Sequence, residues 1–216
     1  VIAERLQIAK QTIPHFYLNI DCNVGELLKV REELNSRNSD YNISLNDFVI
    51  YASALTLKLM PECNTSWMEE NIRFYSSVDI SIAVAIDDGL ITPIIRNADQ
   101  KGLATIAKES RDLANRARSK PMNLKPEEYQ GGTFSISNLG MFGIKDFSAI
   151  INPPQSMILA IGAAEARPII NENALAIGKV MSCTLSVDHR IIDGAAAAKF
   201  TSTFSHTIEE LSFKEK

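Results

Sequence analysis

The alternation of hydrophobic and polar residues along the chain predicts both helices and strands. Residues that favour a helix start, or apolar residues at helical spacing, mark five segments as helical. These are residues 2–10, the segment that follows Asn23, and residues 44–60, 103–119 and 194–211. Pro14 and Pro61 end the first and the third, because proline cannot continue a helix.

Apolar residues that recur at every second position predict the strands. In residues 16–22, Phe16, Leu18, Ile20 and Cys22 alternate with more polar residues. Further strands are expected at residues 78–86, 90–95, 133–137, 156–162, 167–170 and 175–187, with turns at 87–89 and 171–173. Helices mixed with hairpins, without a regular βαβ repeat, favour an α+β sandwich.

Composition narrows the classes of function. The chain has 216 residues, 45% of them hydrophobic, which is enough for one substantial core and one domain. A net charge of −4 with dispersed basic residues argues against a nucleic-acid binder. Residues 147–164 carry no charge, but an Asn-Pro-Pro-Gln loop at 152–155 argues against a membrane span. The chain begins at Val1 rather than Met, which suggests a piece of a longer protein.

The three cysteines are expected to be structural. Cys22, Cys63 and Cys183 form no C-x-x-C pair and are odd in number, which fits reduced, buried thiols in a reducing compartment. Neither a cysteine nucleophile nor a metal site is expected, since metal-ligand spacings of histidine and cysteine are absent from the sequence.

The strongest chemical signal lies at residues 186–194, Ser-Val-Asp-His-Arg-Ile-Ile-Asp-Gly. His189 ends an apolar, strand-like segment, and Asp193 and Gly194 follow at the start of a helix. A lone histidine in such a context is most often structural. The carboxylate at this spacing and the strand-to-helix junction favour a general base, because a neutral imidazole accepts a proton near neutral pH.

A second signal lies at residues 134–143, where a strand enters a glycine-rich turn. The glycines are explained by the turn alone, but the hydroxyl and amide groups at its mouth are not. A hydroxyl there could donate to a developing oxyanion. Strand alternation places Ser135 and Ser137 on the same side, so the pattern leaves both open as the donor.

Four ordered segments together resemble the dihydrolipoamide acyltransferases, the core components of 2-oxo acid dehydrogenase complexes. They are Gly-Leu-Ile-Thr-Pro-Ile (89–94), Ser-Asn-Leu-Gly-Met-Phe-Gly-Ile-Lys (137–145), Ala-Ile-Ile-Asn-Pro-Pro-Gln (149–155) and Asp-His-Arg-Ile-Ile-Asp-Gly (188–194). The second is most similar to the pyruvate-specific acetyltransferases. The resemblance implies a two-layer α/β sandwich with a mixed β-sheet, similar to chloramphenicol acetyltransferase, and one catalytic domain over residues 1–216.

The resemblance also implies roles for individual residues. His189 would be the base, Ser137, which directly precedes Asn138-Leu139-Gly140, the oxyanion donor, and Asp193 a carboxylate that orients the His189 loop through a charge pair. Asn138, Leu139, Gly140, Phe142 and Gly194 are expected to contact substrate. Asp188 and Arg190 are expected to form local salt bridges, and His15 and His206 to be structural.

The implied reaction is reversible acetyl transfer between dihydrolipoamide and coenzyme A, with the lipoyl group supplied by a separate domain and no metal. The implied partners are two further copies in a homotrimer, with the site between subunits, and the pyruvate decarboxylase and dihydrolipoamide dehydrogenase components. A bacterial cytoplasm or a mitochondrial matrix is the expected location. The charged C-terminus leaves it open whether Leu211 and Phe213 join trimers into a cubic or dodecahedral core.

Two alternatives remain open on the sequence. One is a non-catalytic core component, which is disfavoured because His189, Asp193 and Ser137 are all present. The other is a different acyltransferase with the same His-x-x-x-Asp-Gly pattern, such as chloramphenicol acetyltransferase or a peptide-synthetase condensation domain. The segments at 138–143 and 150–155 favour the lipoamide enzymes.

Overall fold

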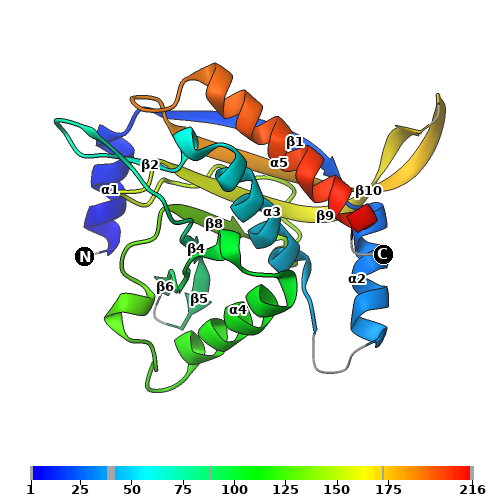
Figure 1. The fold of residues 1–216 in the computed structure, drawn as a ribbon, viewed down its shortest axis with the longest axis horizontal. Helices are drawn as coiled ribbons and strands as arrows, with labels where there is room; N and C mark the ends of the chain where they lie inside the picture. Colours follow the sequence, from blue (N-terminus) through cyan, green and yellow to red (C-terminus); the bar gives the residue numbers. More distant parts are fainter. Residues whose placement is uncertain (1, 38–41, 88, 172, 215–216) are drawn as a thin grey trace.

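The computed structural model describes residues 2–37, 42–87, 89–171 and 173–214 (Figure 1). The expected turns at 87–89 and 171–173 therefore lie partly outside the described residues, as do the side chains of residues 212–214. The α-helices are α1 (Ile2–Thr12), α2 (Gly25–Arg37), α3 (Leu45–Leu59), α4 (Leu103–Arg118) and α5 (Gly194–Lys214). All five helices expected from the sequence are present.

The strands also follow the expected order, with four differences. They are β1 (His15–Asn23), β2 (Thr65–Trp67), β3 (Ile72–Phe74), β4 (Ile80–Ile82), β5 (Val84–Ile86), β6 (Gly89–Ile91), β7 (Ile94–Ile95), β8 (Phe134–Asn138), β9 (Met157–Asn171) and β10 (Ala174–Asp188). The segment expected as one strand at 78–86 divides into β4 and β5, and the one expected at 90–95 divides into β6 and β7. The two strands expected at 156–162 and 167–170 are the single strand β9, and β2 and β3 were not expected.

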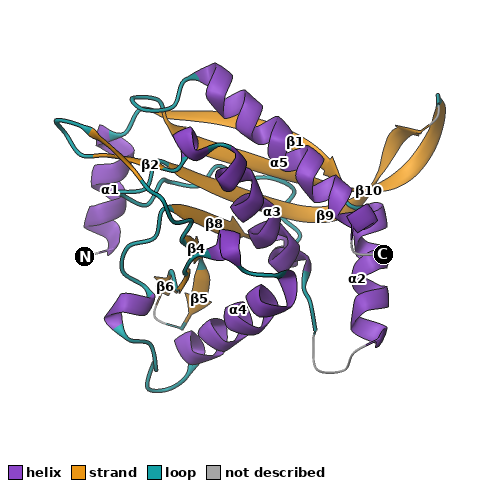
Figure 2. Ribbon diagram, in the orientation of Figure 1, coloured by secondary structure: helices purple, strands orange, loops and turns teal. Residues whose placement is uncertain are grey.

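Six strands form one mixed sheet in the order β1-β10-β9-β8-β4-β7 (Figure 2). Strand β8 pairs in parallel with both β4 and β9, and the other pairs are antiparallel. The sheet and the helices packed on it form two layers, so the expected α+β sandwich with a mixed sheet is confirmed. Two short hairpins, β2–β3 and β5–β6, lie outside the sheet.

The two faces of the sheet differ in chemistry because the side chains alternate. On one face, Phe134 and Ile136 of β8 join the main core, together with the fully buried Phe200 and Phe204 of α5. Along β10, Met181, Cys183, Leu185 and Val187 belong to the same core. The opposite face presents buried hydroxyl groups of β4, β8 and β10: Ser81, Ser135, Ser182, Thr184 and Ser186.

Helix α1 and the loop before β9 cover part of this hydroxyl face. A small second core joins Ala9 and Ile13 of the α1 segment to Ile151 and Ile158. His15 pins the loop, because its Nε2 accepts a hydrogen bond of 3.1 Å from the Ile151 amide while its Nδ1 lies 2.8 Å from the Ile13 carbonyl. His15 is therefore structural, as expected from the sequence.

Three further observations bear on the sequence predictions. Helix α3 begins as expected after Ser44, which forms a capping box with Asp47. All three cysteines are free and buried, and burial raises the pKa of the Cys63 thiol to about 12. No helix in the described part of the chain is long and apolar enough to span a membrane.

Candidate active site

A pocket of about 820 Å³ opens on the hydroxyl face of the sheet, beside β8. Its floor includes Ser135 and Ser137, and α1 contributes Arg5 and Leu6 to its wall. The remaining lining residues come from four other segments: Ala83, Ile86, Leu90, Ile91 and Thr92; Met122; Tyr129, Gln130 and Gly131; and Phe147, Ala149, Ile150, Asn152 and Ile158. A largely apolar cavity with a few polar groups is the usual form of a small-molecule site.

The two serines of β8 differ in what their hydroxyl groups contact. Ser135 is 2% exposed and donates a short hydrogen bond to the side-chain oxygen of Gln155. Ser137 is partly buried, lines the pocket, and has no hydrogen-bond partner among the described residues. A hydroxyl that is accessible and unpaired can donate to a bound molecule, so the geometry favours Ser137 over Ser135.

Gln155 holds the floor of the pocket in place. It is 1% exposed, and its amide nitrogen donates to Ser81 Oγ at 3.0 Å and to the Gly131 carbonyl at 3.2 Å. With Ser135, the side chain therefore joins β4, β8 and the turn at Gly131. Sequence reasoning did not single out Gln155 as a functional residue, although it lies in the segment at 149–155 that carries the family resemblance.

The wall formed by Tyr129, Gln130 and Gly131 is fastened by two arginines. Arg96 pairs with Asp79 at 2.8 Å and donates to the Gln130 carbonyl at 2.9 Å. Arg116 binds the Glu128 carboxylate through two hydrogen bonds of 2.9 and 2.6 Å, and this contact lowers the pKa of Glu128 to about 2. Sequence reasoning missed both arginines, because the residues that they contact are distant along the chain.

His189 directly follows β10, at the end of the sheet opposite to the C-terminal end of β8. Its side chain is exposed, its ring centroid is 5.0 Å from that of Phe16, and its backbone amide donates to the Pro14 carbonyl at 3.1 Å. Neither ring nitrogen is hydrogen-bonded to any residue that the structure describes. The imidazole is thus held by backbone and ring contacts, and both nitrogens remain available to a ligand.

The residues on either side of His189 form the local salt bridge expected from the sequence. Asp188 is 2% exposed and accepts hydrogen bonds of 2.9 and 2.7 Å from Arg190, whose guanidinium lies 5.0 Å from the centre of the Trp67 ring. The hydrogen bond to Asp188 raises the pKa of Arg190. A bidentate arginine stacked on an aromatic ring is a rigid support, so this pair fixes the start of the His189 loop.

Asp193 makes a different contact from the one the resemblance implied. Its carboxylate accepts a hydrogen bond of 2.8 Å from the Ala196 amide, and its carbonyl accepts from Ala197. Among the described residues it forms no ion pair with a cation. Asp193 therefore caps the N-terminus of α5 and fixes the end of the His189 loop through the helix. The charge pair implied by the resemblance stays a prediction.

Ser137 and His189 are far apart within one chain. Ser137 is level with Ala160 of β9, which is level with Thr184 of β10. Asp188 lies four residues further along β10, about 13 Å at the usual rise per residue, and two strand spacings add about 10 Å sideways. The two backbones are thus separated by about 16 Å, too far for one reacting group to contact both side chains.

The other residues expected to contact substrate follow Ser137 or His189 in the chain but do not line the 820 Å³ pocket. Asn138 uses its amide on Asn46 Oδ1 at 3.0 Å and accepts from the Gly140 amide at 2.9 Å, so it joins the end of β8 to α3. Leu139, Gly140 and Phe142 do not line the pocket, and Phe142 is 64% exposed. Gly194 begins α5 beside the Phe16 ring. Their contact with substrate stays a prediction.

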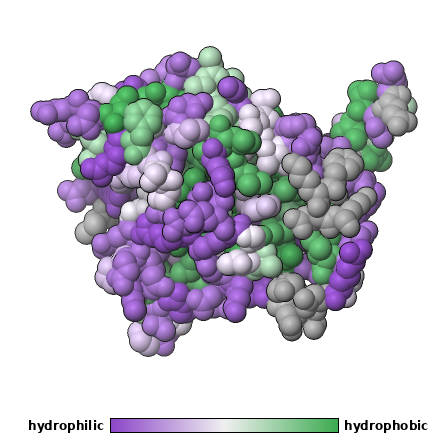
Figure 3. Space-filling model, viewed as in Figure 1, coloured by the Kyte–Doolittle hydropathy of each residue, from purple (hydrophilic) through white to green (hydrophobic). Residues whose placement is uncertain are grey.

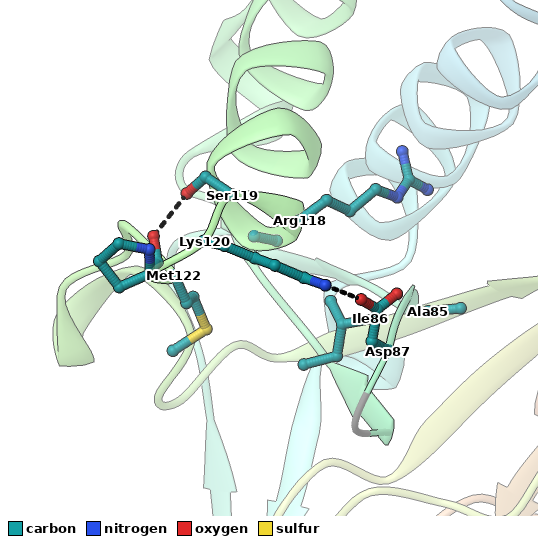
Figure 4. Close-up of a pocket in the computed structure, with 9 residues that line it drawn as sticks. Ala85, Ile86, Asp87, Arg118, Ser119, Lys120 and Met122 are labelled. Carbon is teal, nitrogen blue, oxygen red and sulfur yellow. Dashed lines mark hydrogen bonds and ion pairs between the residues drawn. The ribbon is translucent and has the colours of Figure 1, made fainter.

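A second cavity, of about 680 Å³, lies between the end of α4 and the β5–β6 hairpin (Figure 4). Lys120 reaches across it to Asp87 at 2.5 Å, and Ser119 Oγ donates to the Pro121 carbonyl at 2.9 Å. It adjoins the first pocket through Ile86 and Met122, which line both. Neither His189 nor Ser137 lines this second cavity.

The described residues include no group of three or more histidine, cysteine, aspartate or glutamate side chains placed to hold a metal ion. The reactive inventory therefore consists of an imidazole held on a rigid loop and an unpaired hydroxyl in a pocket. A two-layer sandwich with an exposed histidine and a serine in a pocket is consistent with the acyltransferase class that the sequence resembles.

The family model of the 2-oxoacid dehydrogenases acyltransferase (catalytic domain) matches residues 1–213, and the chain belongs to this family. The dihydrolipoyllysine-residue acetyltransferase component of the pyruvate dehydrogenase complex of Rickettsia bellii is 51% identical over 97% of this chain. A mitochondrial counterpart from Arabidopsis thaliana is 48% identical, also over 97%. The chain spans about half the length of the Rickettsia relative, 50%, and 40% of the plant one.

Solved structures agree with the family. The chain superposes with a TM-score of 0.93 on a probable dihydrolipoamide acetyltransferase from Listeria monocytogenes, at 33% identity over 100% of this chain and 92% of that one. The cubic core of a pyruvate dehydrogenase multienzyme complex gives 0.92 at 32% identity, over 97% and 87%. A chloramphenicol acetyltransferase gives 0.58 at 16% identity, over 96% and 92%, which confirms the expected similarity of fold.

Proposed function

We propose that this chain is the catalytic domain of a pyruvate dehydrogenase complex acetyltransferase, which moves an acetyl group between dihydrolipoamide and coenzyme A. The observation that carries the proposal is the unpaired hydroxyl of Ser137 in a pocket on one side of the sheet, combined with the exposed imidazole of His189 on a fixed loop. The relatives named for this activity support it.

In the proposed reaction His189 accepts the proton of the attacking thiol, that of coenzyme A in the forward direction. A thiol with a pKa near 8.5 is mostly protonated at neutral pH, so a base raises the fraction of thiolate. The sulfur forms a bond to the thioester carbonyl carbon of acetyl-dihydrolipoamide, and Ser137 donates to the oxyanion of the tetrahedral intermediate. The intermediate collapses with release of the dihydrolipoamide sulfur, which takes the proton back from His189.

The separation of the two groups requires two chains. Because about 16 Å divides Ser137 from His189 in one copy, the reacting carbonyl meets Ser137 of one subunit and His189 of the next. A homotrimer with three such sites satisfies this arrangement, because a head-to-tail contact closes into a ring. The pocket of about 820 Å³ accommodates one extended, thiol-bearing arm beside Ser137.

A solved relative supports the choice of residues. The structure of Azotobacter vinelandii dihydrolipoamide acetyltransferase, 31% identical to this chain, is described as an investigation of the catalytic role of one serine, one histidine and one asparagine. Its serine precedes its histidine by the same number of positions that separates Ser137 from His189. Its asparagine follows the histidine at the spacing of Asp193.

The proposal extends to partners and location. The lipoyl group comes from a domain outside this chain, and the pyruvate decarboxylase and dihydrolipoamide dehydrogenase components of the complex supply the acyl group and reoxidise the product dithiol. Trimers assemble further into a cubic core, as in the solved relative of that description. Relatives from bacteria and from a plant mitochondrion support a location in a bacterial cytoplasm or a mitochondrial matrix.

The test is acetyl transfer from acetyl-coenzyme A to free dihydrolipoamide, measured for the unchanged chain and for His189→Ala. We expect turnover in the former and a loss of about a hundredfold or more in the latter. His206→Ala is the matched control, because His206 is an exposed histidine on α5 paired with Glu210. An assembled chain without any transfer would support a scaffold component instead, and activity that survives His189→Ala would place the base elsewhere.

A further inference from the structure

Residues 147–155, which we call the pocket loop, form one wall of the pocket beside Ser137. Three residues near the middle of this loop line the pocket: Ala149, Ile150 and Asn152. The Ile151 side chain is fully buried in the second core, against Ala9 and Ile13 of the α1 segment. Figure 3 shows mostly hydrophilic residues on the side of the molecule where α1 lies in Figure 1, so the apolar side of this helix faces inward.

Side chains from three other segments hold the pocket loop. The Ser186 hydroxyl of β10 donates to the Ala149 carbonyl at 2.7 Å, and Arg5 of α1 donates to the Pro153 carbonyl. From β1, the His15 Nε2 accepts a hydrogen bond of 3.1 Å from the Ile151 amide. A hydroxyl and a guanidinium do not titrate near neutral pH, whereas an imidazole does. The His15 contact is therefore the one of these three that depends on pH.

The two partners of the His15 ring fix its protonation state. Nδ1 lies 2.8 Å from the Ile13 carbonyl, which can only accept, so Nδ1 carries a hydrogen. The Ile151 amide can only donate, so Nε2 carries none. Both contacts together require the neutral imidazole. A proton on Nε2 would set two N–H groups against each other and remove the hydrogen bond to the loop.

The Ile151 amide depends on this hydrogen bond. Ile151 is 0% exposed, and its amide has no second partner among the described residues. A buried N–H group without a partner is costly, so protonation of His15 favours a position of the loop in which this amide reaches water. The loop then leaves the position in which it forms the pocket wall.

The charged groups on β1 and α1 do not favour the imidazolium form. The Tyr17 ring stacks on the His15 ring with 6.0 Å between centroids, and the Tyr17 hydroxyl binds the ammonium of Lys10. The other charged residues of α1, Glu4 and Arg5, lie near its first turn, at the end of the helix away from His15. The charge of this helix nearest to the ring is therefore a cation.

The charged groups on β10 and on the pocket loop give the same result. Asp188 is opposite His15 in the β1–β10 pairing, so the two side chains share a face of the sheet. Its carboxylate accepts two hydrogen bonds from Arg190, which compensates its charge. The pocket loop contains no ionisable side chain. The hydrogen-bond geometry therefore decides which form of His15 the loop accepts.

We propose that His15 is a positioning residue of the Ser137 pocket, and that only its neutral form holds the pocket loop in place for a thiol-bearing arm. The inference rests on the role of this pocket described under Proposed function. Imidazoles take up a proton between pH 8 and pH 5, so the loop is released as the pH falls through this range. Because His15 contacts no reacting atom, its protonation raises KM and leaves kcat to His189.

The first test is amide hydrogen exchange of residues 149–152 between pH 8 and pH 5, expressed as protection relative to an unstructured peptide. In the unchanged chain we expect the protection of the Ile151 amide to fall about tenfold or more as the pH falls. Residues 181–187 of β10 should keep their protection. His15→Gln should keep the protection of Ile151 throughout, because a carboxamide offers one donor and one acceptor and does not titrate.

Two further variants are matched controls. Ser186→Ala removes a contact of the same loop that does not titrate, so it should lower protection at every pH and retain the fall with pH. His206→Gln removes an exposed histidine of α5 and should leave the fall unchanged. Steady-state kinetics gives a second readout. Towards pH 5 the KM of one of the two substrates should rise about fivefold in the unchanged chain relative to His15→Gln, with equal kcat.

The same pH dependence of protection in the unchanged chain and in His15→Gln would overturn the proposal, as would a fall that His206→Gln abolishes. If circular dichroism shows that His15→Gln does not fold, the unchanged chain and Ser186→Ala decide: constant protection of Ile151 in both overturns the proposal, and a selective fall in both supports it. Exchange does not depend on turnover. A pH-dependent loop in a chain without transfer would therefore support the His15 contact and refute the acetyltransferase function.

Discussion

The two serines of β8 differ in the contacts of their hydroxyl groups. They lie two residues apart on the same face of the sheet, yet Ser135 is bound to Gln155 and Ser137 has no partner among the described residues. We expect Ser137→Ala to lower kcat about a hundredfold with little change in KM, because its hydroxyl contacts only the transition-state oxyanion. Ser135→Ala should retain most of the activity and lose stability, since Gln155 is left with an unsatisfied buried oxygen.

Steady-state kinetics of the two variants, with urea unfolding of each, decides between the roles. A larger loss of kcat in Ser135→Ala than in Ser137→Ala would reverse the assignment.

Glu128 is the residue for which the structure gives a pH dependence of stability. Its hydrogen bonds to Arg116 lower its pKa from 4.5 to about 2. The ionised carboxylate is therefore more favourable in the folded chain than in the unfolded chain. The resulting stabilisation is complete above pH 4.5 and is lost as the pH falls towards 2. We expect Glu128→Gln to reduce the free energy of unfolding by about 1 kcal/mol at pH 7, because the group is partly exposed.

Urea unfolding of both proteins between pH 7 and pH 3 measures this difference, which should shrink as the pH falls below 4.5. Glu109→Gln, which removes a single lysine contact, serves as the control. A difference that grows towards low pH would contradict the role of the Arg116 contact.

The sequence contained the reactive residues but not their surroundings. His189 and Ser137 could be proposed because a histidine at a strand-to-helix junction and a serine before a glycine turn are local patterns. Arg5, Gln155 and Arg116 could not, because their roles depend on contacts between segments far apart in the chain. The sequence could not decide between Ser135 and Ser137 for the same reason. Strand alternation places both on the same side of the sheet, and only the contact of Ser135 with the distant Gln155 distinguishes them.

At the level of elements, the loop between β10 and α5 is held at both ends. The Asp188–Arg190 pair fixes its start, and the Asp193 cap of α5 fixes its end. We expect Asp193→Ala to lower the free energy of unfolding by about 1 kcal/mol through loss of the cap. Asp193→Asn should keep both stability and transfer, because asparagine caps a helix as well as aspartate does. This variant therefore removes the charge of Asp193 without removing the cap.

Thermal unfolding and the transfer assay test both variants in parallel. If Asp193→Asn loses as much activity as His189→Ala while remaining equally stable, the charge of Asp193 acts directly and the cap does not explain its role.

Local patterns predicted the helices well and the strand boundaries less well. Ser44 caps the start of α3, and Pro14 and Pro61 follow the ends of α1 and α3. These predicted helix boundaries were therefore confirmed. Residues 163–166 gave no strand signal, yet β9 passes through them, because pairing with β10 stabilises any extended backbone beside it. The β2–β3 hairpin was missed for a related reason: its three-residue strands are too short for alternation to be recognised.

At the level of the whole molecule, the sheet explains why Ser137 and His189 lie far apart within one chain. Strands β8 and β10 are separated by β9 and run in opposite directions, so their C-terminal ends lie at opposite ends of the sheet. Ser137 lies near the C-terminal end of β8, and His189 directly follows the C-terminal end of β10. The same topology that holds both residues rigidly therefore keeps them apart within one chain, and the head-to-tail assembly proposed above would bring Ser137 of one copy to His189 of the next.

Mixing two inactive variants tests this arrangement. Ser137→Ala retains the base, and His189→Ala retains the hydroxyl, so a mixed assembly contains interfaces in which both groups are intact. With random mixing each interface draws two chains independently, and roughly a quarter of the sites should be restored. The measurement is transfer activity after joint refolding of the two variants at equal concentration, compared with each variant refolded alone. If the two groups acted within one chain, every chain in the mixture would lack one of them, and the activity would stay at the level of the separate variants.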